Sequence, residues 1–112
     1  MKNRVFVYGT LKRGHGNHVL LRESEYQGAA QAPPGFRMVS LGGFPGVVEG
    51  EGEVHGEVYL VNDNTMERLD RLEGFPSFYS RTLIPTPYGP AWMYTLNQYE
   101  YGNHPAVEGG EW

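Results

Sequence analysis

One carboxyl group in the sequence stands where a carboxylate is disfavoured. Residues 64–73 predict a helix, and a rotation of about 100° per residue gives it an apolar stripe of Met66, Leu69 and Leu72. Glu73 projects into this stripe, and it also falls in the last turn, where the helix dipole disfavours negative charge. Both effects raise the pKa of a carboxyl group. Such an acid is either a paired structural group or a functional one.

Other acidic residues offer weaker candidates. At the end of its helix, Glu73 could instead point back to solvent or pair with Arg81. Asp70, one turn earlier, flanks the same stripe and is typical of a solvated or pairing residue. Glu57 shares one side of a predicted strand with His55 and Tyr59, which suits either a pocket acid or, more commonly, a hydrogen-bonded structural role.

A glycine-containing loop near the start is the second candidate site. The stretch RVFVYGTLKRGHGNH, residues 4–18, runs from an apolar strand into a loop that could hold an anion, a metal or nothing. His15 and His18, together with His55 or His104, could imitate a metal site, but ligand spacing on a loop is weak evidence. Solvent-exposed loop histidines are the ordinary interpretation, so no metal is expected.

Several common catalytic patterns are missing from the sequence. There is no cysteine, no serine stands in a nucleophile-elbow pattern, and the glycines match neither a Walker loop nor a dinucleotide fingerprint. Tyr79 and Arg81 alternate on one predicted strand and so share a face. They could both reach a pocket, or they could simply pack, with the arginine extending to solvent.

The elements that must position these residues are short strands around one clear helix. A second, short helix is predicted over residues 17–25, and β-strands are predicted at 5–8, 26–32, 36–41, 45–48, 54–61, 79–86 and 91–96. Residues 45–48 and 54–61 read as a hairpin with an acidic tip, and 79–86 and 91–96 as another. We therefore expect an α+β fold, a small mixed β-barrel of about six strands with one or two flanking helices.

Composition limits the class of protein. The 112 residues fit one domain, 1–112, and 16 glycines with 8 prolines favour many tight turns. A net charge of −4 without a basic cluster argues against nucleic acid as a partner. No apolar run approaches the roughly 18 residues that span a membrane. We expect a cytoplasmic protein whose tail, from about residue 99, packs loosely.

Two separated motifs resemble a known family. FVYGTLKRG near the start and LDRLEGFPSFYSR after the main helix make the chain similar to the gamma-glutamylcyclotransferase fold group. It is most similar to the AIG2-like and gamma-glutamylamine cyclotransferase branch. PGVVEGEGEVHGEVYLV resembles the central part of that branch, and TPYGPAWMY a small bacterial subgroup. The resemblance covers residues 5–96.

The resemblance implies an enzyme of the lyase or acyltransferase type that uses no cofactor. Its substrate would be a small gamma-glutamyl amine or amino acid, from which it would release 5-oxoproline and a free amine. In the family, main-chain groups of the loop bind the glutamyl moiety and the acid of the Glu-Gly motif is the general acid and base. Carried over, the catalytic residue is Glu73, and the substrate-binding residues are Tyr8, Gly9, Thr10, Leu11 and Tyr79.

Two other classes of function stay open on sequence. One is a non-catalytic module that binds a carboxylate metabolite at the same mouth; Glu73 turned to solvent or locked to Arg81 would support it. The other is a partner-binding domain in which Trp92, Tyr94 and Tyr99 cover an interface.

Overall fold

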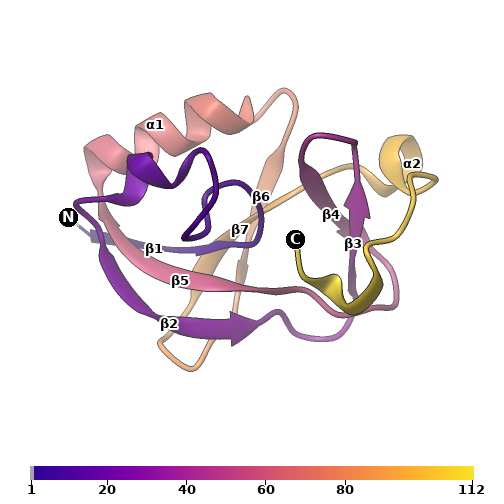
Figure 1. The fold of residues 1–112 in the computed structure, drawn as a ribbon, viewed down its shortest axis with the longest axis horizontal. Coiled ribbons are helices and arrows are strands. Elements are labelled where there is room, and N and C mark those ends of the chain that lie inside the picture. The colour runs from indigo at the N-terminus through magenta and orange to yellow at the C-terminus, as the bar shows by residue number, and fades with distance from the viewer. Residues whose placement is uncertain (1) are drawn as a thin grey trace.

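Seven strands and a few short helices make up the computed structural model, which describes residues 2–112 (Figure 1). The strands are β1 (Lys2–Val7), β2 (Glu25–Gln31), β3 (Phe36–Ser40), β4 (Pro45–Glu49), β5 (His55–Asn62), β6 (Ser80–Ile84) and β7 (Ala91–Thr95). The helices are α1 (Asp63–Glu73) and α2 (Gln98–Tyr101), with 3₁₀ turns η1 (His18–Leu21) and η2 (Glu108–Gly110). The predicted α+β class is confirmed.

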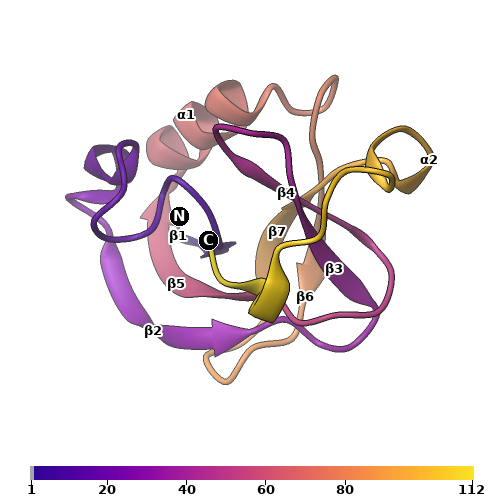
Figure 2. The same ribbon diagram turned by 45° about the vertical axis from the view of Figure 1, so that its right-hand side comes forward.

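The strands form two sheets. The larger has the order β2-β5-β1-β7-β6, in which β1 and β7 run parallel and the other pairs are antiparallel. The smaller is the antiparallel pair β3-β4. A backbone hydrogen bond of 2.8 Å from the Leu96 N–H to the Val47 carbonyl joins the two where β7 ends. Among residues 2–112, the strands therefore curve around a common interior without closing into one barrel (Figure 2).

One of the two predicted hairpins is wrong. β6 and β7 pair as expected, with Arg81 opposite Tyr94, but β4 pairs with β3 and not with β5. The reason is that β5 has β1 along one edge and β2 along the other, so neither edge is open to β4. The short helix predicted over residues 17–25 is reduced to the single turn of η1.

Helix α1 has local signals at both ends. The Asn62 side chain accepts a hydrogen bond of 2.7 Å from the Thr65 N–H, which caps the first turn. Gly74 ends the helix with φ of 68°, a left-handed conformation that favours glycine. Met66 and Leu69 are buried as predicted, but Leu72 is 43% exposed, which corrects the predicted stripe. The last turn of α1 thus has a partly exposed apolar side chain, and Leu72 and Glu73 both line the cavity described below.

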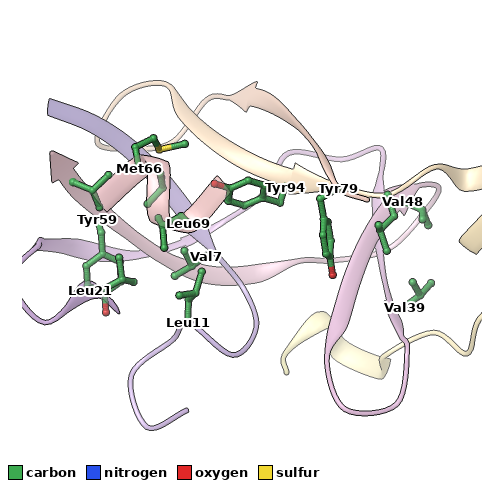
Figure 3. Close-up of a cluster of buried hydrophobic side chains, with 13 residues drawn as sticks. Val7, Leu11, Leu21, Val39, Val48, Tyr59, Met66, Leu69, Tyr79 and Tyr94 are labelled. Atoms are coloured by element: carbon green, nitrogen blue, oxygen red, sulfur yellow. The ribbon is translucent and has the colours of Figure 1, made fainter. Parts of the chain in front are cut away.

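The buried side chains of α1 pack against the larger sheet. Figure 3 shows Met66 and Leu69 close to Val7, Leu21 and Tyr59. These contacts fix the rotation of α1 on the sheet, and the rotation decides where Glu73 lies.

The segment after residue 99 is joined to the rest of the fold by hydrogen bonds and an ion pair. Its backbone bonds to β3 on both sides of Ala106, from the Ser40 N–H to the Pro105 carbonyl at 2.8 Å and from the Val107 N–H to the Met38 carbonyl at 2.9 Å. The Lys12 ammonium, nearly buried, forms an ion pair with Glu111. The composition of the tail gives no sign of these contacts. No helix in the described part of the chain is long and apolar enough to cross a membrane.

Candidate functional site

A cavity of about 270 Å³ lies between the end of β1, the start of β4, the last turn of α1 and the start of β6. Its lining residues are Phe6, Val7, Tyr8, Gly9, Thr10, Leu11, Asn17, Gly43, Phe44, Pro45, Leu72, Glu73, Phe78, Tyr79 and Tyr94. All six of the predicted site residues are among them. The cavity thus brings together two segments that are more than 60 positions apart in the sequence.

The loop that follows β1 is folded on itself. The Lys12 N–H donates to the Gly9 carbonyl at 3.0 Å, and Asn17 bonds to Thr10 through its backbone N–H and its side-chain amide, each at 2.9 Å. These bonds leave the N–H groups of Gly9, Thr10 and Leu11 without a hydrogen-bond acceptor in residues 2–112. Successive free N–H groups beside a cavity are a common way to bind an anion.

Gly9 is required by a close approach of two chain segments. A Cβ atom at this position would lie 2.7 Å from Pro45 Cγ and 2.9 Å from Pro45 Cδ, both shorter than real carbon contacts. The start of β4 therefore presses against the loop and forms the facing wall of the cavity. Tyr8, just before it, donates a hydrogen bond of 2.8 Å from its hydroxyl to the Tyr94 carbonyl, which ties the loop to β7.

The Glu73 side chain enters this cavity from the end of α1. Burial raises the pKa of its carboxyl group from 4.5 to about 7. No hydrogen bond or ion pair to the carboxyl group is found in residues 2–112. The two ordinary alternatives for Glu73 are thus not adopted: the side chain is not turned out to solvent, and Arg81 pairs elsewhere.

Arg81 is held by Asp70, which lies one turn before Glu73. A guanidinium nitrogen of Arg81 is 3.4 Å from Asp70 Oδ2, and the guanidinium lies over the rings of Phe75 and Trp92 at 4.4 and 4.5 Å. Arg81 is not part of the cavity wall, although Tyr79, which precedes β6, is. The prediction that Asp70 is a pairing residue is confirmed.

Three tyrosines lie near enough to Glu73 for its charge to affect their pKa, and each donates its hydroxyl hydrogen elsewhere. Tyr8 donates to the Tyr94 carbonyl, Tyr79 to the Pro45 carbonyl at 2.7 Å, and Tyr94 to Asp70 Oδ1 at 2.7 Å. Figure 3 shows the hydroxyl of Tyr94 turned toward α1. Burial, with a contribution from the nearby Glu73, raises the pKa of each phenol well above its usual value. The phenols are therefore neutral and give the cavity fixed walls.

The other sequence candidates lie apart from this cavity. Glu57 accepts hydrogen bonds from the Tyr59 hydroxyl at 2.9 Å and the Arg13 N–H at 3.0 Å, which is a structural role. His18 bonds through Nδ1 to the Leu11 carbonyl at 2.9 Å. In the described residues, no group of three or more His, Cys, Asp or Glu side chains is placed to hold a metal ion.

Two parts of the cavity lining could not be assigned to it from the sequence. Gly43, Phe44 and Pro45 form one wall of the cavity, beside Gly9, and the sequence offers no sign of it, since this wall depends on the β3-β4 pairing. Tyr94, which on sequence is a candidate interface residue, is buried and lines the cavity. Alternation along β7 could have placed Tyr94 on the buried side with Trp92.

Comparison with known proteins shows which family the sequence matches. The family described as gamma-glutamyl cyclotransferase, AIG2-like, matches residues 5–112. A protein of Vibrio cholerae named as a candidate gamma-glutamylcyclotransferase is 44% identical over 112 residues, covering 100% of this chain and 96% of that protein. The predicted resemblance is confirmed.

Two mammalian proteins are also similar. The human gamma-glutamylaminecyclotransferase is 38% identical over 93 residues, covering 71% of this chain and 59% of that protein. The crystal structure of an AIG2-like protein from Mus musculus superposes with a TM-score of 0.82 at 31% identity, covering 96% of this chain and 86% of that one.

Proposed function

Because the chain belongs to the AIG2-like gamma-glutamyl cyclotransferase family, we propose that it converts a gamma-glutamyl amine or gamma-glutamyl amino acid into 5-oxoproline and a free amine. In this reaction the substrate's own α-amine attacks its γ-carbonyl carbon, the new C–N bond closes the ring, and the old amide C–N bond breaks. The observation that carries the proposal is the unpartnered Glu73 carboxyl in the same cavity as the free N–H groups of the loop.

Glu73 is proposed to move the protons. Over the whole reaction the α-nitrogen gives up two protons and the leaving nitrogen gains two, so one group that alternates between base and acid balances the chemistry. An α-ammonium group is a much weaker acid than an ordinary glutamic acid side chain, so an ordinary glutamate would be a poor acceptor for its proton. Burial raises the pKa of Glu73 to about 7 and so narrows this gap.

The loop after β1 is proposed to bind the negative charge of the substrate. The N–H groups of Gly9, Thr10 and Leu11 can bind the α-carboxylate of the substrate or the oxyanion that develops on its γ-carbonyl. Tyr79 packs against the bound glutamyl chain with its hydroxyl held by Pro45. Since the nucleophile is tethered to the electrophile, folding the substrate back on itself supplies much of the rate enhancement.

The experiment is 5-oxoproline release from glutamine, gamma-glutamyl-alanine and gamma-glutamyl-ε-lysine, with the wild type beside Glu73→Gln. Loss of a general acid and base predicts a fall of about 100-fold or more in kcat, with the melting temperature of the variant retained. Wild-type turnover by a folded Glu73→Gln protein would overturn the assignment. Binding of glutamate-like compounds without turnover of any substrate would instead favour a carboxylate-binding module.

A further inference from the structure

The outer part of the cavity is apolar. Phe44, Leu72 and Phe78 line it and remain 37%, 43% and 39% exposed, although each is a large hydrophobic side chain. They come from the turn between β3 and β4, the last turn of α1 and the segment before β6. We call these three residues the apolar rim. Exposed apolar groups that meet around a cavity, and are not scattered singly, indicate a binding surface.

Phe78 is fixed in place before any ligand arrives. Its ring packs edge-on against Phe44, Tyr79 and Tyr101, with centroid separations of 6.3, 5.0 and 5.7 Å. Its backbone N–H donates to the Gly74 carbonyl at 2.7 Å. A rim that is held by its own neighbours loses little conformational freedom when it contacts a ligand.

The polar groups of the cavity can pair with the two charges of a glutamyl group, and the lining offers no further charged side chain. Its lining includes one ionisable carboxyl, that of Glu73, and no lysine, arginine or histidine. The α-ammonium of a gamma-glutamyl group would use Glu73, and the α-carboxylate would use the loop N–H groups. A further charge on the leaving amine would lie beside the apolar side chains of the partly exposed rim, with no other charged group of the cavity lining to pair with.

We propose that the apolar rim selects gamma-glutamyl compounds whose leaving amine is uncharged beyond the amide and carries an alkyl or aromatic group. The inference rests on the proposed function and specifies the substrate class of the same cavity. The amide nitrogen would lie near Glu73, and the substituent would pack between Phe44, Leu72 and Phe78. Amines with a second ammonium group would be poor leaving groups here.

A matched pair of substrates tests this directly. The gamma-glutamyl n-hexylamide and the gamma-glutamyl 5-aminopentylamide have the same length and differ by a terminal methyl or ammonium group. We expect the wild type to release 5-oxoproline from the hexylamide with a kcat/KM about tenfold higher or more. Equal or better use of the 5-aminopentylamide would overturn the inference and leave the proposed function standing. No release from either compound, nor from gamma-glutamyl-alanine, would overturn both.

Charge variants locate the preference at the rim. Phe78→Glu and Phe44→Glu each place a carboxylate where the substituent lies, so the preference should fall by about tenfold or reverse in the variant that keeps its fold. Leu83→Glu is the control, because Leu83 is an apolar residue that is 54% exposed on β6 and is not part of the cavity lining. It should keep the wild-type ratio. An equal change in Leu83→Glu would show an effect of net charge and would overturn the inference.

Discussion

Asp70 and Glu73 lie one turn apart on α1 and have opposite surroundings. Asp70 accepts a hydrogen bond from Tyr94 and pairs with Arg81, whereas no partner for the Glu73 carboxyl is found in residues 2–112. The helix therefore presents one carboxylate that is held and one that is free to exchange protons.

Glu73 should make the protein less stable as the pH rises. Its pKa is about 7 in the folded protein and 4.5 unperturbed, so the folded state binds the extra proton and stability is lost as the pH rises from about 4.5 through 7. Glu73→Gln should therefore be more stable than the wild type at pH 8, by up to about 3 kcal/mol, and equal to it at pH 4. Urea unfolding at both pH values measures the difference. Glu67→Gln, an exposed position on the same helix, is the control, and a pH-independent difference for Glu73→Gln would contradict the prediction.

The activity should rise with pH, whereas the stability should fall. The base that accepts the substrate's proton must be ionised, so kcat/KM should rise with pH through an inflection near 7. The measurement is 5-oxoproline release between pH 5 and 9 with one substrate. A kcat/KM that is already at its maximum at pH 5 would mean that the titrating group is not the buried Glu73.

Gly9→Ala should damage both the fold and the site. The added Cβ would meet Pro45 at 2.7 Å, so either the loop or the start of β4 must shift. Overpacking of this kind costs about 1–3 kcal/mol, and the displaced N–H groups should lower kcat/KM about tenfold or more. Gly16→Ala is the matched control, because a Cβ at that position in the same segment has no atom within 4 Å. Similar melting temperatures and activities for the two variants would refute this account.

Tyr79→Phe should change stability more than chemistry. The hydroxyl group already donates to the Pro45 carbonyl, so its removal leaves a buried acceptor unpaired at a cost of about 1 kcal/mol. We expect kcat to fall less than about tenfold, below the range of a lost general acid. Thermal unfolding and 5-oxoproline release on the variant test both parts, with Tyr99→Phe as a control at a fully exposed tyrosine. A loss of kcat as large as that of Glu73→Gln would assign proton transfer to Tyr79.

Glu111→Gln should loosen the loop from the tail. Glu111 pairs with the nearly buried Lys12, which directly follows Leu11, and this contact lowers the pKa of Glu111. Its stabilising effect is therefore present at neutral pH and is lost as the pH falls through that lowered pKa. We expect KM at pH 7 to rise about threefold with little change in kcat, as for a modest loss of loop order. Glu108→Gln in the same tail should leave KM unchanged. An unaltered KM in Glu111→Gln would mean that the tail does not hold the loop.

The parts of the structure set by local sequence could be predicted. Helix α1 was predictable because its apolar spacing, Asn62 and Gly74 all act within a few residues, and the same spacing gave Glu73 its unusual place. The exposure of Leu72 was not predictable, because helical spacing places it on the same side as Leu69, whereas in the fold it lines an open cavity. Pro45 could not be assigned to the site, since its contact with Gly9 depends on the β3-β4 pairing. Long-range pairing of this kind leaves no local pattern.

The cavity is assembled from segments spread along the whole chain, which bears on its biosynthesis. The loop at Gly9 is made first, Pro45 and Glu73 follow, and Tyr94 on β7 supplies the last wall. Because β7 lies between β1 and β6 in the larger sheet, β1 lacks its neighbour on that side until the ribosome has released residues 91–95. A nascent chain that ends before β7 therefore carries Glu73 in a cavity that still lacks the wall formed by Tyr94.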